Sequence, residues 1–296
     1  MQTVHASSTP PRQQAHQAAR AQLIATLPVA ERHLRLAGIP TAVLEGGEGP
    51  PMVLLHGPAS HAAHWMHVIP GLVASRRVIA PDLPGHGASE AGEQPLDADR
   101  MLDWLGEVIE HTCDSPPTVV GQTLGGAIAA RFASRHPGRV RHLVLVDTFG
   151  LTPFAPPPDF ALAVNAFLAQ PTQDTHERLW RQCAFDLDTI RQRMGPHWDP
   201  FVASNLERAR SPRAEAALHA LMECFALPAI APDELQRITT PVTLVWGRHD
   251  RATPLAAATA ASTRFGWPLH VIDDCSVDAH MEQPQALLRV LLEVQP

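Results

Sequence analysis

The stretch of sequence that decides the fold reads Gly121-Gln122-Thr123-Leu124-Gly125-Gly126. The apolar pair Val119 and Val120 precedes it, and an alanine-rich helical pattern, residues 124–135, follows it. A short apolar run that ends in glycine and passes straight into a helix is typical of a strand that turns sharply into a helix. Glycines on both sides let the backbone bend this tightly. The stretch therefore predicts a strand–turn–helix unit with the Thr123 hydroxyl at its apex.

The rest of the chain repeats the pattern of a short apolar run followed by a polar or glycine turn. Such runs occur at residues 52–55, 78–80, 143–146, 242–245 and 269–272, after strand-like stretches at 31–37 and 41–44. Helical patterns alternate with them at residues 97–111, 124–135, 255–264 and 283–294. This alternation predicts an α/β fold, with a mostly parallel central sheet flanked by helices. Chemistry in such sheets lies at the carboxyl ends of the strands.

Three kinds of segment are expected along the chain. Residues 29–149 and 239–296 carry the strand signals and form the predicted core. Residues 150–238 carry helical patterns broken by prolines, and we interpret them as a helical lid over the strand ends. Residues 1–28 are polar at their start and predict a flexible leader with one short amphipathic helix.

Composition excludes several classes of partner. The 296 residues have 45% hydrophobic content and a net charge of −7 without a basic cluster, which argues against nucleic acid and anionic membranes. No apolar run is long enough to span a membrane, and no signal peptide is recognisable. The four cysteines are widely spaced, as expected for reduced thiols, so a cytoplasmic protein is predicted.

Several motifs occur in one characteristic order. They are Leu54-Leu55-His56-Gly57, Asp82-Leu83-Pro84-Gly85-His86-Gly87, the stretch around Thr123, Trp246-Gly247-Arg248-His249-Asp250, and Glu282-Gln283-Pro284. Together they resemble the α/β-hydrolase superfamily, in its lidded small-molecule branch, over roughly residues 30–295. The resemblance implies a nucleophile elbow, a histidine base, an orienting carboxylate and an oxyanion hole.

The resemblance assigns two members of this machinery directly. Thr123 occupies the nucleophile position, where the family places serine. A threonine keeps the hydroxyl, but its β-methyl group stiffens the side chain and crowds the turn. Asp250 matches the family's carboxylate, and its alternative role is to cap its own turn.

The base position departs from the family pattern. Counting back from Glu282 in the family's spacing gives Val277, which cannot take a proton. His280 lies three residues further on, where a second histidine without a catalytic role is often present. Asp274, Asp278 and Cys275 share the loop and are further candidates. A proton acceptor is therefore expected from His280 or from a loop carboxylate.

The oxyanion position is also altered. In the family, the residue after the His-Gly pair lends its backbone N–H. Here Gly57 is followed by Pro58, which has none. The N–H of Leu124 remains, and losing one donor typically costs about 3 kcal/mol of transition-state stabilisation. Residues Gly57, Pro58, Leu124 and Val277 are thus expected around the reaction centre.

The resemblance favours an enzyme that acts on a small apolar ester-like or carbonyl substrate by a non-standard mechanism. A lyase, a cyclase or a non-catalytic binder of a small apolar ligand is the alternative. No cofactor is expected. Three histidines at positions 61, 64 and 67 are joined by no carboxylate, so no metal is expected either.

Overall fold

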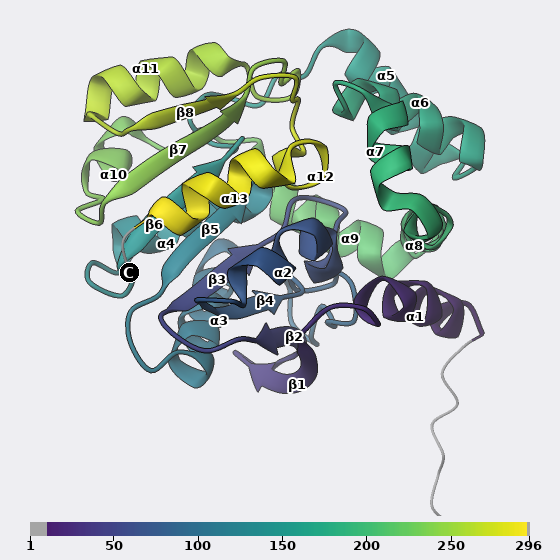
Figure 1. Cartoon of the computed structure of the whole chain (residues 1–296), viewed down its shortest axis with the longest axis horizontal. Helices are drawn as coiled ribbons and strands as arrows, with labels where there is room; N and C mark the ends of the chain where they lie inside the picture. Colours follow the sequence, from purple (N-terminus) through teal and green to yellow (C-terminus); the bar gives the residue numbers. More distant parts are fainter. Residues whose placement is uncertain (1–10, 295–296) are drawn as a thin grey trace, which may run out of the picture.

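The computed structural model describes residues 11–294 of the chain. It contains one eight-stranded sheet with the strand order β1-β2-β4-β3-β5-β6-β7-β8 (Figure 1). The strands are β1 (Ala30–Leu36), β2 (Ile39–Gly46), β3 (Pro51–Leu55), β4 (Arg77–Pro81), β5 (Thr118–Gln122), β6 (His142–Val146), β7 (Val242–Gly247) and β8 (Leu269–Ile272). β1 pairs antiparallel with β2, β2 antiparallel with β4, and all later neighbours pair in parallel. The predicted α/β fold is confirmed.

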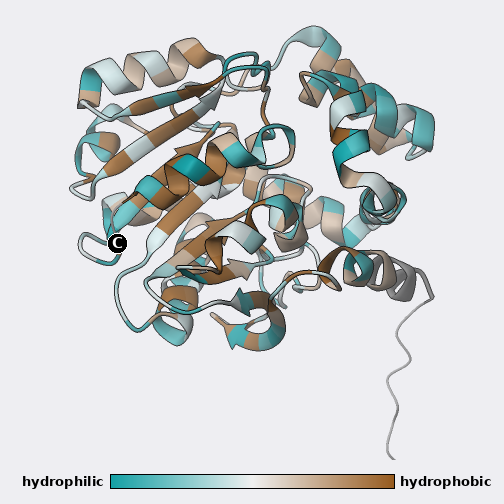
Figure 2. Ribbon diagram, viewed as in Figure 1, coloured by the Kyte–Doolittle hydropathy of each residue, from teal (hydrophilic) through white to brown (hydrophobic). Residues whose placement is uncertain are grey.

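Helices cover both faces of the sheet. On one face, α3 (Ala98–Thr112), α4 (Leu124–Arg135) and α11 (Leu255–Phe265) bury side chains such as Trp104, Phe132 and Ala258 against the strands. On the other face, α2 (Ile69–Leu72) and α13 (Pro284–Glu293) do the same through Leu72 and Leu291. The strands between them are strongly apolar (Figure 2), as burial on both faces requires.

A run of helices lies between β6 and β7 and corresponds to the segment predicted as a lid. It consists of α5 (Pro158–Ala169), α6 (Gln173–Cys183), α7 (Leu187–Met194), the 3-10 turn η2 (Gly195–His197), α8 (Trp198–Ala209) and α9 (Pro212–Leu221). The helices α5 to α8 stand to one side of the sheet in Figure 1. The last part of the segment, η3 (Met222–Ala226) and α10 (Pro232–Gln236), packs instead on α4 and so belongs to the core layer.

The segment predicted as a flexible leader is folded in its second half. Helix α1 (Pro11–Ile24) packs against α8 and against the 3-10 turn η1 (Ala62–His67) (Figure 1). Its Leu23 is fully buried, and Arg20 is buried beside Asp82. The first ten residues of the predicted leader lie outside the described residues. No helix within residues 11–294 is long and apolar enough to cross a membrane.

Candidate active site

The turn between β5 and α4 has the backbone geometry of a strained elbow. Thr123 adopts φ 46° and ψ −104°, a conformation that β-branched residues rarely occupy. Such strain costs of order 1–3 kcal/mol and persists only where the surroundings impose it. The surroundings here are backbone: a Cβ on Gly121 would lie 2.5 Å from the Gly125 carbonyl oxygen, and one on Gly125 would lie 2.5 Å from the Leu55 carbonyl oxygen. The glycines therefore allow the close approach that holds the threonine in place.

The Thr123 hydroxyl is buried and unpaired. The residue is 1% exposed, and its Oγ1 has no hydrogen-bond partner among the described residues. It lies against the loop after β3, because a Cβ on Gly57 would come within 2.5 Å of Oγ1. A buried hydroxyl without a partner is destabilising by about 1–3 kcal/mol. Strain and an unpaired hydroxyl thus coincide at one residue, as is common at functional sites.

Thr123 lines a cavity of about 500 Å³ between the sheet's loops and the helices inserted between β6 and β7. The inserted helices supply most of the apolar wall, including Phe160, Val164, Phe167 and Trp180, and the rest of the chain supplies Phe149, Ala252 and Val277. Other aromatic residues of these helices, such as Phe201, are buried in an apolar cluster that also includes Leu23 of α1 and Met281. This is a mostly apolar pocket with a few polar groups, as is typical of small-molecule sites.

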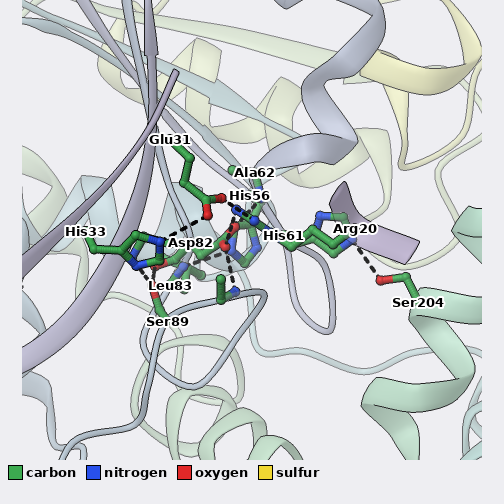
Figure 3. Close-up of polar contacts among 12 residues, drawn as sticks. Arg20, Glu31, His33, His56, His61, Ala62, Asp82, Leu83, Ser89 and Ser204 are labelled. Carbon is green, nitrogen blue, oxygen red and sulfur yellow. Dashed lines mark hydrogen bonds and ion pairs between the residues drawn. The ribbon is translucent and has the colours of Figure 1, made fainter. Parts of the chain in front are cut away.

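The buried carboxylate of Asp82 holds the loop that carries Gly57 and Pro58 in place. Asp82, at the end of β4, accepts hydrogen bonds from the N–H of Ala62 (2.7 Å) and of Ala88 (2.8 Å). Arg20 of α1 forms an ion pair with the same carboxylate at 2.7 Å (Figure 3). The N-terminal helix thereby helps to position this loop, a role that the sequence did not indicate.

Pro58 and its neighbour Ala59 both line the cavity. Ala59 has a left-handed backbone conformation (φ 57°). On the other side of Thr123, helix α4 begins at Leu124. The N–H groups of a helix's first turn have no partner within the helix, so the Leu124 N–H is available at the elbow.

His280 lies in the short helix α12 (Ala279–Glu282) and is packed away from the cavity wall. Its ring contacts that of Trp65, with centroids 4.8 Å apart. Burial lowers its pKa to about 3, so the ring is neutral at physiological pH. The structure contains no hydrogen bond between His280 and Thr123, and Nδ1 of His280 has no partner among the described residues.

The residues just before α12, in contrast, do reach the cavity. Val277 and Asp278 both line it. The side-chain amide of Gln122, next to Thr123, donates to the Val277 carbonyl oxygen and to Asp278 Oδ1, each at 3.1 Å. Burial, reinforced by the charges of Glu282 and Asp250, raises the pKa of Asp278 to about 8. Of the loop groups that the sequence left open, Asp278 is the one at the cavity wall.

Asp250 is hydrogen-bonded to its own loop. It accepts from the N–H of Ala252 (2.7 Å) and of Thr253 (3.0 Å), and from the Thr253 hydroxyl. Burial raises its pKa to about 6. These bonds are those of a turn-capping residue, while Ala252 beside it lines the cavity.

A second buried carboxyl group lies near Asp250 and was missed by sequence reasoning. Asp147 follows β6 directly, with φ 46°, and accepts a hydrogen bond from the Gly247 N–H at 2.8 Å. Burial and the nearby Asp250 raise its pKa well above the usual value. Its position at a strand's carboxyl end was visible in the sequence, but nothing there indicated its backbone conformation or its neighbour.

Two of the three histidines noted in the sequence contact each other, since the ring centroids of His61 and His64 are 4.5 Å apart. His61 contacts the Ser204 hydroxyl of α8 at 3.1 Å, and His64 lines the cavity. Burial lowers the pKa of His67 to about 4. Within the described part of the chain, no group of three or more His, Cys, Asp or Glu residues could hold a metal ion.

A model of the alpha/beta hydrolase family matches residues 52–290. The chain belongs to this family. Its sequence is 32% identical to the pimeloyl-[acyl-carrier protein] methyl ester esterase of Aromatoleum aromaticum, over 80% of the chain and 94% of that protein. It is 41% identical to the 2-hydroxymuconate semialdehyde hydrolase of Pseudomonas sp. strain CF600, in a local match that covers 41% of the chain and 44% of that protein.

Solved structures agree with this assignment. The 2-hydroxy-6-oxo-6-phenylhexa-2,4-dienoate hydrolase of Rhodococcus sp. strain RHA1 superposes with a TM-score of 0.78 and 27% identity, covering 90% of the chain and 99% of that structure. A meta-cleavage product hydrolase of Pseudomonas fluorescens IP01 superposes with a TM-score of 0.74 and 26% identity, covering 90% and 97%. The protein is therefore an enzyme of the α/β-hydrolase superfamily.

Proposed function

We propose that this enzyme hydrolyses a small, mostly apolar ester-like or related carbonyl substrate, with Thr123 as the nucleophile and Asp278 as the proton acceptor. The observation that supports this most directly is the Thr123 side chain, strained and unpaired at the wall of a cavity that Asp278 also lines. The esterase and hydrolase activities named for its relatives support the same reaction class.

In the proposed reaction, the Thr123 hydroxyl gives its proton to the Asp278 carboxylate as Oγ1 attacks the substrate carbonyl carbon. The tetrahedral intermediate then expels the alcohol, which takes the proton back from Asp278. A water molecule next attacks the acyl-threonine carbonyl, again with Asp278 as proton acceptor. Collapse of the second intermediate releases the acid and returns the proton to Oγ1.

The Leu124 N–H is the donor that this mechanism assigns to the oxyanion. Because Pro58 has no N–H, one backbone donor of the usual pair is missing, and the reaction is expected to be slow. Gln122 has a positioning role, since its amide donates to Asp278 Oδ1 and holds that carboxyl group beside the elbow.

His280 is assigned no proton transfer in this scheme. Its ring is neutral, buried against Trp65 and outside the cavity lining. Asp250 is assigned the role of shaping the loop around Ala252, because it accepts hydrogen bonds from Ala252 and Thr253 of that loop. Its negative charge also contributes to the raised pKa of Asp278.

The pH dependence of ester hydrolysis tests the proton acceptor. Asp278 accepts a proton only when ionised, so the rate should rise as the pH passes about 8, the pKa of that carboxyl group. Asp278→Asn should lower kcat/KM for p-nitrophenyl acetate and butyrate by about 10²–10⁴-fold and remove this rise. Asp274→Asn, at an exposed position of the same loop, is the matched control and should leave both unchanged.

Two results would contradict the assignment. One is an Asp278→Asn enzyme that keeps the wild-type rate and pH profile. The other is a loss of activity in His280→Gln alone, which would return the proton-acceptor role to the histidine. Mass spectrometry after treatment with a phosphonate ester tests the nucleophile separately, since the adduct is expected on Thr123.

A further inference from the structure

We infer that Arg208 forms a carboxylate-binding subsite in the cavity, so that the ligand is an apolar molecule with one carboxylate. Arg208 lies on helix α8 and lines the same cavity as Thr123. The lid thus presents a cation, while the core presents the hydroxyl and Asp278. This inference rests on the proposed function for the identity of the reacting end, but the subsite itself is a matter of binding.

The Arg208 guanidinium is buried without full compensation. The residue is 6% exposed, and its Nη1 has no hydrogen-bond partner among the described residues. Burial lowers its pKa, yet an arginine keeps its charge in proteins. A buried charge is costly unless it is both paired and hydrogen-bonded. A cation held in this way at a cavity wall is suited to a negatively charged ligand.

The neighbouring carboxylate, Glu215 of α9, compensates this charge only in part. Its Oε2 lies 3.6 Å from Arg208 Nη1, whereas hydrogen-bonded ion pairs have separations of about 2.7–2.9 Å. The exposed pair between Arg181 and Glu177 on α6 is much closer, at 2.6 Å. The Glu215 side chain is 39% exposed as a whole, but its Oε2 is buried and also has no hydrogen-bond partner among the described residues. The buried Arg208–Glu215 pair, which needs close contact most, therefore has a longer separation than the exposed Arg181–Glu177 pair.

The surroundings of Arg208 favour a carboxylate over other ligand groups. Asn205, one helical turn earlier on α8, also lines the cavity and contacts His176 Nε2 at 3.0 Å. A planar guanidinium binds the two oxygens of a carboxylate with two parallel hydrogen bonds. Because most of the remaining wall is apolar, the rest of the ligand is expected to be hydrocarbon.

Calorimetry with matched ligand pairs tests the subsite without any catalysis. The acids phenylacetate, phenylbutanoate and phenylhexanoate are each compared with the neutral amide of the same length. Wild-type protein should bind the best acid about tenfold or more tightly than its amide, the effect expected for hydrogen bonds to a charged group. Arg208→Gln should abolish this preference. The matched control Arg210→Gln, at an exposed position on the same helix end, should keep it.

Glu215→Gln is expected to strengthen acid binding, whereas Arg208→Gln weakens it. It removes the carboxylate that competes for Arg208, so acid binding should become stronger, with amide binding unchanged. This result keeps the proposal testable if Arg208→Gln fails to fold. A wild-type protein that binds no acid, or binds acids and amides equally, would overturn the subsite. Tighter binding of phenyl phosphate than of every acid would overturn its assignment to carboxylates.

These outcomes are separable from a failure of the proposed hydrolysis. The acids and amides need not react with Thr123 to be bound, so the Thr123→Ala protein should show the same preference for acids. Loss of ester hydrolysis with this preference intact would contradict the proposed chemistry alone. Hydrolysis without any preference would contradict the subsite alone.

Discussion

Two turns at the carboxyl edge of the sheet meet at the cavity, and they differ in what they tolerate. In the β5–α4 elbow, residues 121–126, backbone atoms crowd each glycine so closely that no side chain fits. In the loop between β8 and α12, residues 273–278, the main chain is anchored by Glu282, which accepts a hydrogen bond from the Ser276 N–H at 2.8 Å. The side chains of Val277 and Asp278 nevertheless face open cavity space.

The elbow fixes the backbone geometry of the site, whereas the loop supplies the side chains for its chemistry. A glycine of the elbow cannot change without moving the backbone, so the elbow keeps its shape even with a threonine at its apex. In the loop, side chains rather than backbone atoms line the cavity, so position 277 can hold a valine, 7% exposed, without a change in the backbone. In the proposed mechanism, the site therefore keeps its position in the fold while the groups that transfer protons differ from the family pattern.

The largest expected effect comes from filling the elbow. Gly121→Val would place side-chain atoms against the Gly125 carbonyl oxygen and the Gly126 backbone. Overpacking of this kind is expected to lower the free energy of unfolding by roughly 3 kcal/mol. Urea denaturation followed by circular dichroism measures it. Gly106→Val is the control, because Gly106, like Gly121, has no positive φ and a Cβ there would meet only the Phe132 ring, at 3.6 Å. Equal losses in both variants would show that crowding is not the cause.

A smaller effect is expected from restoring the family's groups on both turns together. Thr123→Ser with Val277→His should raise kcat/KM for short p-nitrophenyl esters by about 100-fold over Thr123→Ser alone, since a positioned base contributes that much or more. The new histidine would also shift the apparent pKa of the reaction from about 8 towards the usual histidine range. A double variant no faster than the single one would show that the loop does not aim position 277 at the elbow.

The smallest expected effect concerns the stability of the elbow residue itself. Thr123→Ala removes an unpaired buried hydroxyl together with one methyl group, so the free energy of unfolding should stay within about 1 kcal/mol of wild type. Thr148→Ala is the control, because the equally buried Thr148 hydroxyl donates to the Phe149 carbonyl oxygen at 3.0 Å. That variant should lose about 1–3 kcal/mol. Similar losses in both would contradict the interpretation of the Thr123 hydroxyl as structurally unused.

Much of the architecture could be predicted from the sequence because its causes are local. Buried parallel strands are short apolar runs, so β3 to β8 were identifiable from composition and spacing alone. The helical content between β6 and β7 was equally visible. The docking of α1 was not, because the Arg20–Asp82 ion pair joins residues that only the folded chain brings together. The second part of the predicted leader, helix α1, is therefore packed against the rest of the fold.

The sequence by itself determined the family, the elbow and the absence of a histidine at position 277, since each depends on residue type and order along the chain. Only the tertiary structure decided which of the loop's groups reaches the cavity. Asp278 and His280 are two residues apart, yet the start of α12 directs one to the cavity wall and the other onto Trp65. Such a difference arises from backbone direction and packing. The same holds for Arg208, whose burial and loose contact with Glu215 depend on how α8 and α9 pack.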